Sequence, residues 1–397
     1  MGGEAVAQPA LPAAPLAAAI AAVIGDDNLL WEILVRVGFP STLVRAALVS
    51  RRWLRHASDR AFLRRFRERH PPHLLGFYLK EFGLPYQRFV PVSQAPELAA
   101  AVRLAADAGG YFGISHSRNG RLRVTEYGET GDDFRDAVLA PLRPARGTVF
   151  PPPRPPEHTR IWPFLAGDDD GAAAVGMFSI GTKLQVDLLT LRSGAWVVHR
   201  TAVLNHPEST LPEITGVLPP ARGKIYILSD PYYYFVQHVL TQTHPARIVR
   251  LDMATAKVSV IPFPDTVRTT NYKLSLGEEE DKDSGLNLVY AEGYLLSVWR
   301  LAPNTNDWVL VYDRIHVREA CDRLEDVKVR AVDDTCEFVF LGLEASALVI
   351  CMHLKSRAEE VEKISDDPAY MRYVHVSPLK MVSGNREETD KASRTVR

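Results

Sequence analysis

From residue 71 to about residue 380, the sequence repeats one short pattern, and this repetition limits the folds open to the chain. A small-residue turn precedes a run of β-branched and aromatic residues, as in GKIYIL (223–228) and GYLLSV (293–298). A second apolar run follows, and then a polar turn such as RSG (192–194). Runs of this composition between turn residues predict short β-strands throughout the region.

The spacing of these units indicates how the strands are grouped. Lys183 and Lys224, like Gly293 and Phe338, lie about 40–45 residues apart, which is the size of a four-stranded propeller blade. Other gaps are longer, so the repeat is degenerate. Many short strands leave many exposed edges unless they are arranged radially. The pattern therefore favours a β-propeller, with an irregular β-sandwich as the alternative.

Residues 26–69 have a helical pattern instead. Asp26 and Asp27 are typical helix N-caps, and the apolar positions after them fall on one broad face. Gly38 and Pro40 end this first helix. Helices this short are marginal alone, so they must pack on one another or on a partner. Three further short helices are expected to begin at Ser41, at Ser50 or Arg51, and at Ser58 or Asp59.

The two ends of the chain differ from both regions. Residues 1–24 are rich in alanine and proline, contain Glu4, and have no Lys or Arg before the apolar run. These features favour a disordered leader over a targeting peptide. The expected organisation is a disordered leader (1–24), a helical module (25–69), an all-β domain (71–380) and a disordered tail (381–397).

Composition places the chain in a broad class. Hydrophobic residues make up 46% and the formal net charge is −1, which suits an ordinary globular protein and argues against a nucleic-acid coat. The three cysteines form no close pair, which suits a reducing compartment. We therefore expect an intracellular protein, in the cytoplasm or nucleus.

None of the sequence motifs that resemble catalytic or metal sites fits its pattern. GMFSIGTK (176–183) does not place its lysine directly after the second glycine, as a phosphate-binding loop requires. His70 and His73 have no evident third metal ligand, and GDDD (167–170) is typical of a solvated loop. We therefore expect no catalytic, cofactor-binding or metal-binding residues, and no enzymatic activity.

Nine arginines lie between residues 45 and 69. A nucleic-acid interface would place such charges along one face for phosphate contact. Here they adjoin a strongly apolar stretch, and Trp53, Phe62 and Phe66 recur at a spacing typical of a core. The cluster favours docking to another protein, where arginines would speed encounter with an acidic surface.

Residues 26–66, DDNLLWEILVRVGFPSTLVRAALVSRRWLRHASDRAFLRRF, resemble the F-box. The chain departs from that motif at Ile24-Gly25, where Leu-Pro is usual, and at Ser50, where Cys is common. The region 71–380 resembles the degenerate β-propeller domain of plant F-box proteins, through IVRLDMATAKVSVIPFP (248–264) and CEFVFLGL (336–343). The resulting fold class is a small all-α F-box module followed by a large all-β domain.

The resemblance implies a function without bond chemistry. F-box helices dock on the Skp adaptor of a Skp–cullin–F-box ubiquitin ligase, and the attached domain presents a target protein for ubiquitination. The chain would contribute proximity between target and ubiquitin. A propeller that binds small molecules or acts as an enzyme, with an incidental helical N-terminus, is the alternative, and a nucleic-acid binder comes third. The expected adaptor-binding residues are Leu29, Leu30, Ile33, Leu34, Val37, Pro40, Leu43, Val44 and Val49.

One aromatic segment is a candidate for target binding. DPYYYFVQHVLTQTH (230–244) contains Tyr232, Tyr233, Tyr234 and Phe235, which are typical interface anchors. A buried strand of the same composition is the alternative and is favoured by β-propensity. The sequence names neither the target protein nor any modification it carries.

Overall fold

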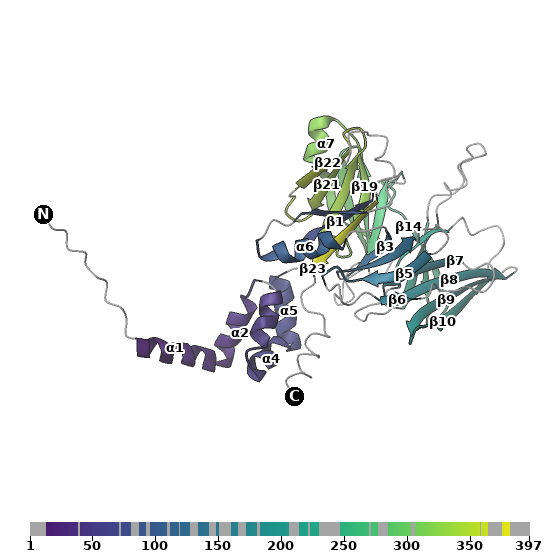
Figure 1. The fold of residues 1–397 in the computed structure, drawn as a ribbon. Helices are drawn as coiled ribbons and strands as arrows, with labels where there is room; N and C mark the ends of the chain where they lie inside the picture. Colours follow the sequence, from purple (N-terminus) through teal and green to yellow (C-terminus); the bar gives the residue numbers. More distant parts are fainter. Residues whose placement is uncertain are drawn as a thin grey trace. The chain divides into compact units, whose positions relative to one another are not determined.

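A computed structural model of the chain separates into two compact units. One contains Met1–His73 and Met381–Arg397, and the other contains Leu74–Lys380 (Figure 1). The structure describes residues 13–381 except 39, 71–72, 81–86, 93–95, 109–111, 119, 128–133, 143–147, 151–159, 166–171, 181–182, 206–213, 221–222, 230–246, 270, 277–284, 303–305, 358 and 364–374.

The N-terminal unit is helical. Asp26, Ser50 and Asp59 cap α2 (Asp27–Val35), α4 (Arg51–Ala57) and α5 (Arg60–Arg69) through their side chains, as their short oxygen-bearing side chains predict. The second expected helix begins at Pro40 instead of after Ser41, because proline suits the first helical position. The helices are α1 (Ala13–Gly25), α2 (Asp27–Val35), α3 (Pro40–Ala47), α4 (Arg51–Ala57) and α5 (Arg60–Arg69).

Helix α1 replaces the expected disorder in residues 13–24 of the leader, and residues 1–12 lie outside the described residues. Its sequence, AAPLAAAIAAVIG, is dominated by alanine, which has the highest helix propensity. Pro15 lies in the first turn, where its missing N–H costs no intrahelical hydrogen bond. Pro15 is therefore compatible with a helix that begins at Ala13.

The core of the helical unit lies between α2 and α5. Leu30, Leu34 and Phe62 are fully buried there. The ring of Trp31 meets Phe62 edge-on, with 5.6 Å between the ring centroids, a favoured aromatic geometry. Trp53 packs against this core from α4, as its predicted internal role requires.

The second unit contains six sheets among the described residues, and five of these are antiparallel throughout. We number them as blades 1 to 6. Blade 1 contains β3 (Phe112–Arg118), β4 (Arg121–Tyr127), β5 (Phe134–Leu139) and β6 (Thr148–Phe150). Blade 2 contains β7 (Arg160–Leu165), β8 (Ala172–Ile180), β9 (Lys183–Arg192) and β10 (Ala195–Asn205). Blade 3 contains β11 (Ile214–Val217), β12 (Lys224–Ser229), β13 (Arg247–Asp252) and β14 (Val258–Pro262).

Blades 4 and 5 also have four strands each, and blade 6 has three strands. Helices α6 (Ala99–Asp107) and α7 (Arg318–Arg323) and the short 3-10 helix η1 (Pro96–Leu98) lie outside the sheets. Blade 4 contains β15 (Tyr272–Leu276), β16 (Leu286–Glu292), β17 (Leu295–Leu301) and β18 (Trp308–His316). Blade 5 contains β19 (Val327–Val332), β20 (Phe338–Leu343), β21 (Leu348–His353) and β22 (Glu359–Lys363). Blade 6 contains β2 (Arg88–Pro91), β1 (His73–Lys80) and β23 (His375–Met381), in that order across the sheet.

Each blade packs on the next, and blade 6 closes the series. Apolar clusters join blades 2 and 3, 3 and 4, 4 and 5, and 5 and 6. Blades 1 and 2 meet through Val138 and Leu165, and the Ser117 hydroxyl of blade 1 donates to the Pro378 carbonyl of blade 6. Blade 6 combines β1 and β2 with the C-terminal β23. The sheets therefore form a closed radial arrangement, in which strands from the two ends of the unit share one blade.

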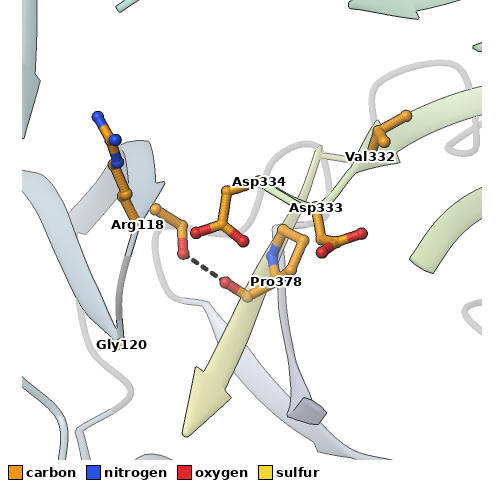
Figure 2. A pocket seen from close by; sticks show the side chains of 7 residues that line it. Arg118, Gly120, Val332, Asp333, Asp334 and Pro378 are labelled. Carbon is orange, nitrogen blue, oxygen red and sulfur yellow. Dashed lines mark hydrogen bonds between the residues drawn. The ribbon is translucent and has the colours of Figure 1, made fainter. Parts of the chain in front are cut away.

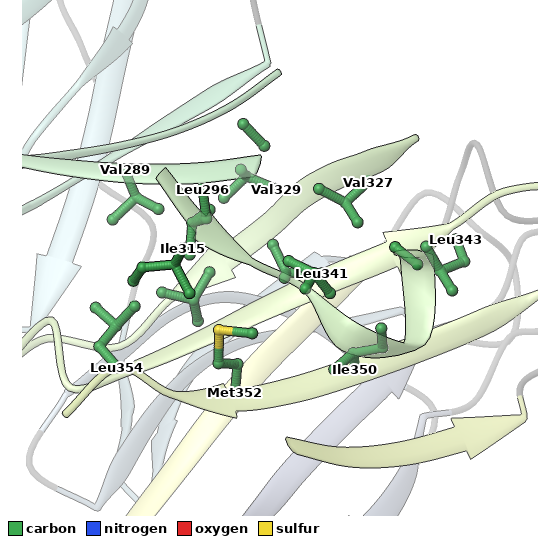
Figure 3. Close-up of a cluster of buried hydrophobic side chains, with 14 of the residues drawn as sticks. Val289, Leu296, Ile315, Val327, Val329, Leu341, Leu343, Ile350, Met352 and Leu354 are labelled. Atoms are coloured by element: carbon green, nitrogen blue, oxygen red, sulfur yellow. The ribbon is translucent and has the colours of Figure 1, made fainter. Parts of the chain in front are cut away.

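The interface between blades 4 and 5 shows how the sheets are held together. Val289, Leu341 and Ile350 are fully buried in it, within a cluster of valine, leucine and isoleucine side chains (Figure 3). Asn271 adds a polar link. Its amide nitrogen donates to the carbonyl oxygens of Ala291 (3.0 Å) and Val327 (2.8 Å).

Candidate docking surface of the helical unit

The structure divides the expected adaptor-binding residues of α2 into two sets. Leu30 and Leu34 are fully buried in the core of the helical unit. Leu29 and Ile33 lie at the surface, with 46% and 41% of their area exposed. Residues four apart lie one above the other on a helix, and neighbours in sequence point about 100° apart. Helix α2 therefore presents one apolar face to its own core and a second apolar face to solvent.

The remaining expected residues are placed differently. Leu43 is buried in the core, and Val37 is partly buried against it. Val49 lies between α3 and α4 and is 67% exposed. The side chains of Pro40 and Val44 lie outside the described residues. Leu29, Ile33 and Val49 are thus the expected docking residues whose side chains are available to a partner.

Exposed apolar residues that the sequence did not single out lie close by in the chain. Leu48 precedes Val49 and is also exposed. On α1, Ile20, Val23 and Ile24 are exposed at helical spacing. The signal for α1 was its i, i+3, i+4 apolar pattern, which the alanine-rich and proline-rich context obscured.

Arg52 ties the start of α2 to α4. Its guanidinium donates to the carbonyl oxygens of Ile24 (2.8 Å) and Gly25 (2.7 Å), and to the Asp27 carboxylate (Nε–Oδ1 2.7 Å). His56 Nε2 lies 2.8 Å from the same carboxylate oxygen. The hydrogen bond with His56 and then that with Arg52 hold the pKa of Asp27 below its ordinary value. The atypical Ile24-Gly25 opening is therefore fixed through its backbone carbonyls.

Other arginines of the cluster also have partners within the unit. The Arg65 guanidinium lies over the Trp31 ring, 4.6 Å from its centroid, and 3.3 Å from the Glu32 carboxylate. Arg36 reaches the other oxygen of Glu32 at 3.6 Å. Arg52 and Arg65 thus have internal structural roles.

The candidate target-binding residues Tyr232, Tyr233, Tyr234 and Phe235 lie outside the described residues. A small pocket does lie where blades 1, 5 and 6 meet (Figure 2). Its volume is about 30 Å³, and its lining includes Arg118 and Asp334. This is room for a water molecule or two, well below the size of sites that hold small organic ligands.

Within the described part of the chain, no group of three or more His, Cys, Asp or Glu side chains is placed to hold a metal ion. His70, considered above as a metal ligand, instead contacts the carbonyl oxygen of Val35 through Nε2 at 2.8 Å. None of the described helices has the length and apolar character needed to cross a membrane.

Fold and surface together define a β-propeller protein preceded by a helical unit with exposed apolar side chains. A family model described as "F-box protein AT5G49610-like, beta-propeller" matches residues 113–383, more than half of the chain. The chain therefore belongs to this F-box protein β-propeller family. The match confirms the propeller expected from the sequence.

Solved structures with loosely similar folds are diverse. A chain of a nidogen/laminin complex is 11% identical, with 78% of this chain and 99% of that chain covered and a TM-score of 0.38. AztD from Citrobacter koseri is 10% identical, with coverages of 76% and 97% and a TM-score of 0.33. With scores this low, these likenesses carry no argument about fold or function. No curated protein matches the sequence.

Proposed function

We propose that the chain is the substrate-recognition subunit of a Skp–cullin–F-box ubiquitin ligase. In this proposal the helical unit binds the Skp adaptor, and through it the cullin. The propeller holds a target protein close to the ubiquitin-charged conjugating enzyme. The chain itself performs no bond chemistry and raises the local concentration of the target.

Membership of an F-box protein family is the observation that carries the proposal. The family model begins at residue 113 and does not cover the helical unit, so the proposed role of that unit is supported by its own sequence and surface. Its sequence resembles the F-box, and α2 exposes Leu29 and Ile33 on the side away from its core. Exposed large apolar side chains on a short helix are typical of a surface that a partner covers.

Helix α2 allows a variant that removes docking without removing the core. Leu29→Asp combined with Ile33→Asp places two charges on the exposed face, and Leu30 and Leu34 remain in the core. Full-length chain should co-purify with a Skp adaptor, and this double variant should not, because two aspartates cannot be desolvated in an apolar interface.

The matched control is Leu104→Asp, on an exposed helical position of α6 in the propeller unit. It carries a similar apolar-to-charged change and should retain the adaptor. Failure of the unaltered chain to bind any Skp adaptor contradicts the proposal. Equal binding by the double variant contradicts the assignment to α2.

The ligase role has a separate test. A chain lacking residues 26–66 keeps the propeller but loses the F-box-like segment. When this deletion variant is expressed in cells, it should bind target proteins without delivering them for ubiquitination. The ubiquitinated forms of propeller-bound proteins should therefore be fewer than in cells that express the intact chain. Unchanged ubiquitination of every bound protein contradicts the role of substrate receptor.

A further inference from the structure

The longest of the described strands, β10, lies at an open edge of its sheet. It spans 11 residues and, among the described strands, pairs with β9 alone, from Ala195 opposite Arg192 to Asn205 opposite Lys183. In Figure 1 the teal strands β7 to β10 follow one another, with β10 last. At about 3.3 Å per residue, its free edge offers roughly 35 Å of backbone N–H and C=O groups.

The last strands of the other blades carry features that discourage pairing with another chain. β2 and β14 are short and end in proline, β6 has three residues, and β22 is short and charged, with the sequence EEVEK. β18 has two register shifts and a residue at positive φ, Arg314. Short length, proline, charge and bulges are the usual protections of strand edges. β10 contains no Pro, Lys, Asp or Glu, and has one register shift, between Val198 and Arg200.

β10 also exposes apolar side chains suited to contact with an added strand. Val197, Val198 and Val203 are 46%, 50% and 49% exposed. Val197 and Val198 are adjacent in the strand and therefore point to opposite faces of the sheet. An added strand would find a β-branched partner on each face, the kind of pair that stabilises a sheet.

The charges of the β9–β10 hairpin determine which strand fits. Its exposed formal charges are Lys183, Arg192 and Arg200. Its one acidic residue, Asp187, is buried and accepts a hydrogen bond from the Thr201 hydroxyl at 2.6 Å. The accessible charge of the hairpin is thus positive. An acidic segment is attracted, whereas a second copy of the same hairpin would bring like charges together.

We propose that the free edge of β10 binds an extended acidic segment with alternating apolar side chains, which joins blade 2 as a fifth strand. The inference rests on the proposed function in one respect, since the segment is assigned to the target protein of the ligase. Backbone hydrogen bonds along the edge give affinity, and the valines and Arg200 give selectivity. The residues of this surface all belong to the propeller unit.

A strand-forming acidic peptide tests this edge directly. The probe is a fluorescently labelled peptide of sequence EVEVEVE, with EVEPEVE and KVKVKVK as controls, titrated with the full-length chain and followed by anisotropy. EVEVEVE should bind. The proline peptide should fail because it interrupts strand pairing, and the lysine peptide should fail because its charge is repelled. Amide hydrogens of β10 should exchange more slowly with EVEVEVE present.

Two variants of exposed residues test the assignment. Arg200→Glu and Val198→Glu should each weaken EVEVEVE binding by about tenfold, because each places a negative charge beside the acidic peptide. Val309→Glu on β18, a similarly exposed valine of another last strand, should leave it unchanged. No binding of EVEVEVE, equal binding of EVEPEVE, or insensitivity to both β10 variants overturns the proposal. Self-association of the chain that Val198→Glu abolishes overturns it too, since a second copy would then occupy the edge.

The two proposals fail separately. Val198→Glu should retain the Skp adaptor, and Leu29→Asp with Ile33→Asp should retain EVEVEVE binding. Loss of adaptor binding in every form of the chain, with EVEVEVE binding intact, would refute the ligase role and leave the strand-binding edge standing.

Discussion

At the scale of single residues, a partly buried histidine links the stability of the propeller to pH. His116 Nδ1 accepts a hydrogen bond from the Leu165 backbone N–H at 3.2 Å, which joins blades 1 and 2. Burial, with the charges of Arg118, Arg123 and Arg121, lowers the pKa of His116 to about 3. The neutral ring is therefore the form that the fold requires.

The pH dependence follows from this direction. An unfolded histidine gains its proton near pH 6.5, whereas His116 in the folded propeller stays neutral until about pH 3. Stability is therefore full above pH 6.5 and falls as the pH drops toward 3, by up to about 2 kcal/mol at pH 5. Urea unfolding of the propeller at pH 7 and pH 5 should show a smaller pH effect in His116→Asn. If the unfolding free energy of the variant falls by the same amount between pH 7 and pH 5, His116 is not the source of the pH dependence.

Arg52 supports a second prediction at this scale. Arg52→Ala removes the donors that hold the Ile24 and Gly25 carbonyls and the Asp27 carboxylate. Amide hydrogens of α1 should then exchange faster, while those of α5 stay protected by the core around Phe62. Unchanged exchange in α1 would show that Arg52 does not hold that helix.

At the scale of elements, the two faces of α2 separate stability from docking. Leu30→Ala leaves a cavity in the core of the helical unit and should cost about 2–5 kcal/mol in its unfolding free energy. Leu29→Ala, one residue earlier, removes an exposed side chain and should cost less than about 0.5 kcal/mol. Chemical denaturation measures both, and equal losses would contradict the division into faces.

The sequence predicts where these helices begin and end better than it predicts which side of each helix is buried. The caps Asp26, Ser50 and Asp59 are local signals, because a short side chain contacts the backbone of its own first turn. Leu29 and Leu30 are both apolar, and the packing of α2 against the other helices decides which of them is buried. Helix α1 was missed because the Ala/Pro-rich sequence around it resembles a linker, although Pro15 in its first turn is compatible with a helix that begins at Ala13.

At the scale of the whole molecule, closure depends on blade 6, whose strands come from both ends of the propeller unit. Phe77 of β1 and Phe340 of β20 meet edge-on at 5.2 Å between centroids, which joins blade 6 to blade 5. The spacing of the repeats predicted four-stranded blades from local turns and strands. The pairing of β1 with β23 joins segments about 300 residues apart, and such pairing leaves no local sequence signal.

Closure has its own test. Phe340→Ala should lower the unfolding free energy of the propeller by about 3–5 kcal/mol, because it empties a fully buried site between two blades. Val361→Ala, at an exposed position on β22, is the control and should change it little. Thermal unfolding monitored by tryptophan fluorescence compares the two. A loss in Phe340→Ala no larger than in the control would contradict the closed arrangement.

The central proposal is that the helical unit binds a Skp adaptor and thereby places the propeller in a ubiquitin ligase. Titration of a purified Skp adaptor into the full-length chain, followed by calorimetry, tests it most directly. The account predicts saturable one-to-one binding that weakens about a hundredfold or more in Leu29→Asp with Ile33→Asp and is retained in Leu104→Asp. No binding to the unaltered chain, or equal binding to the double variant, would contradict it.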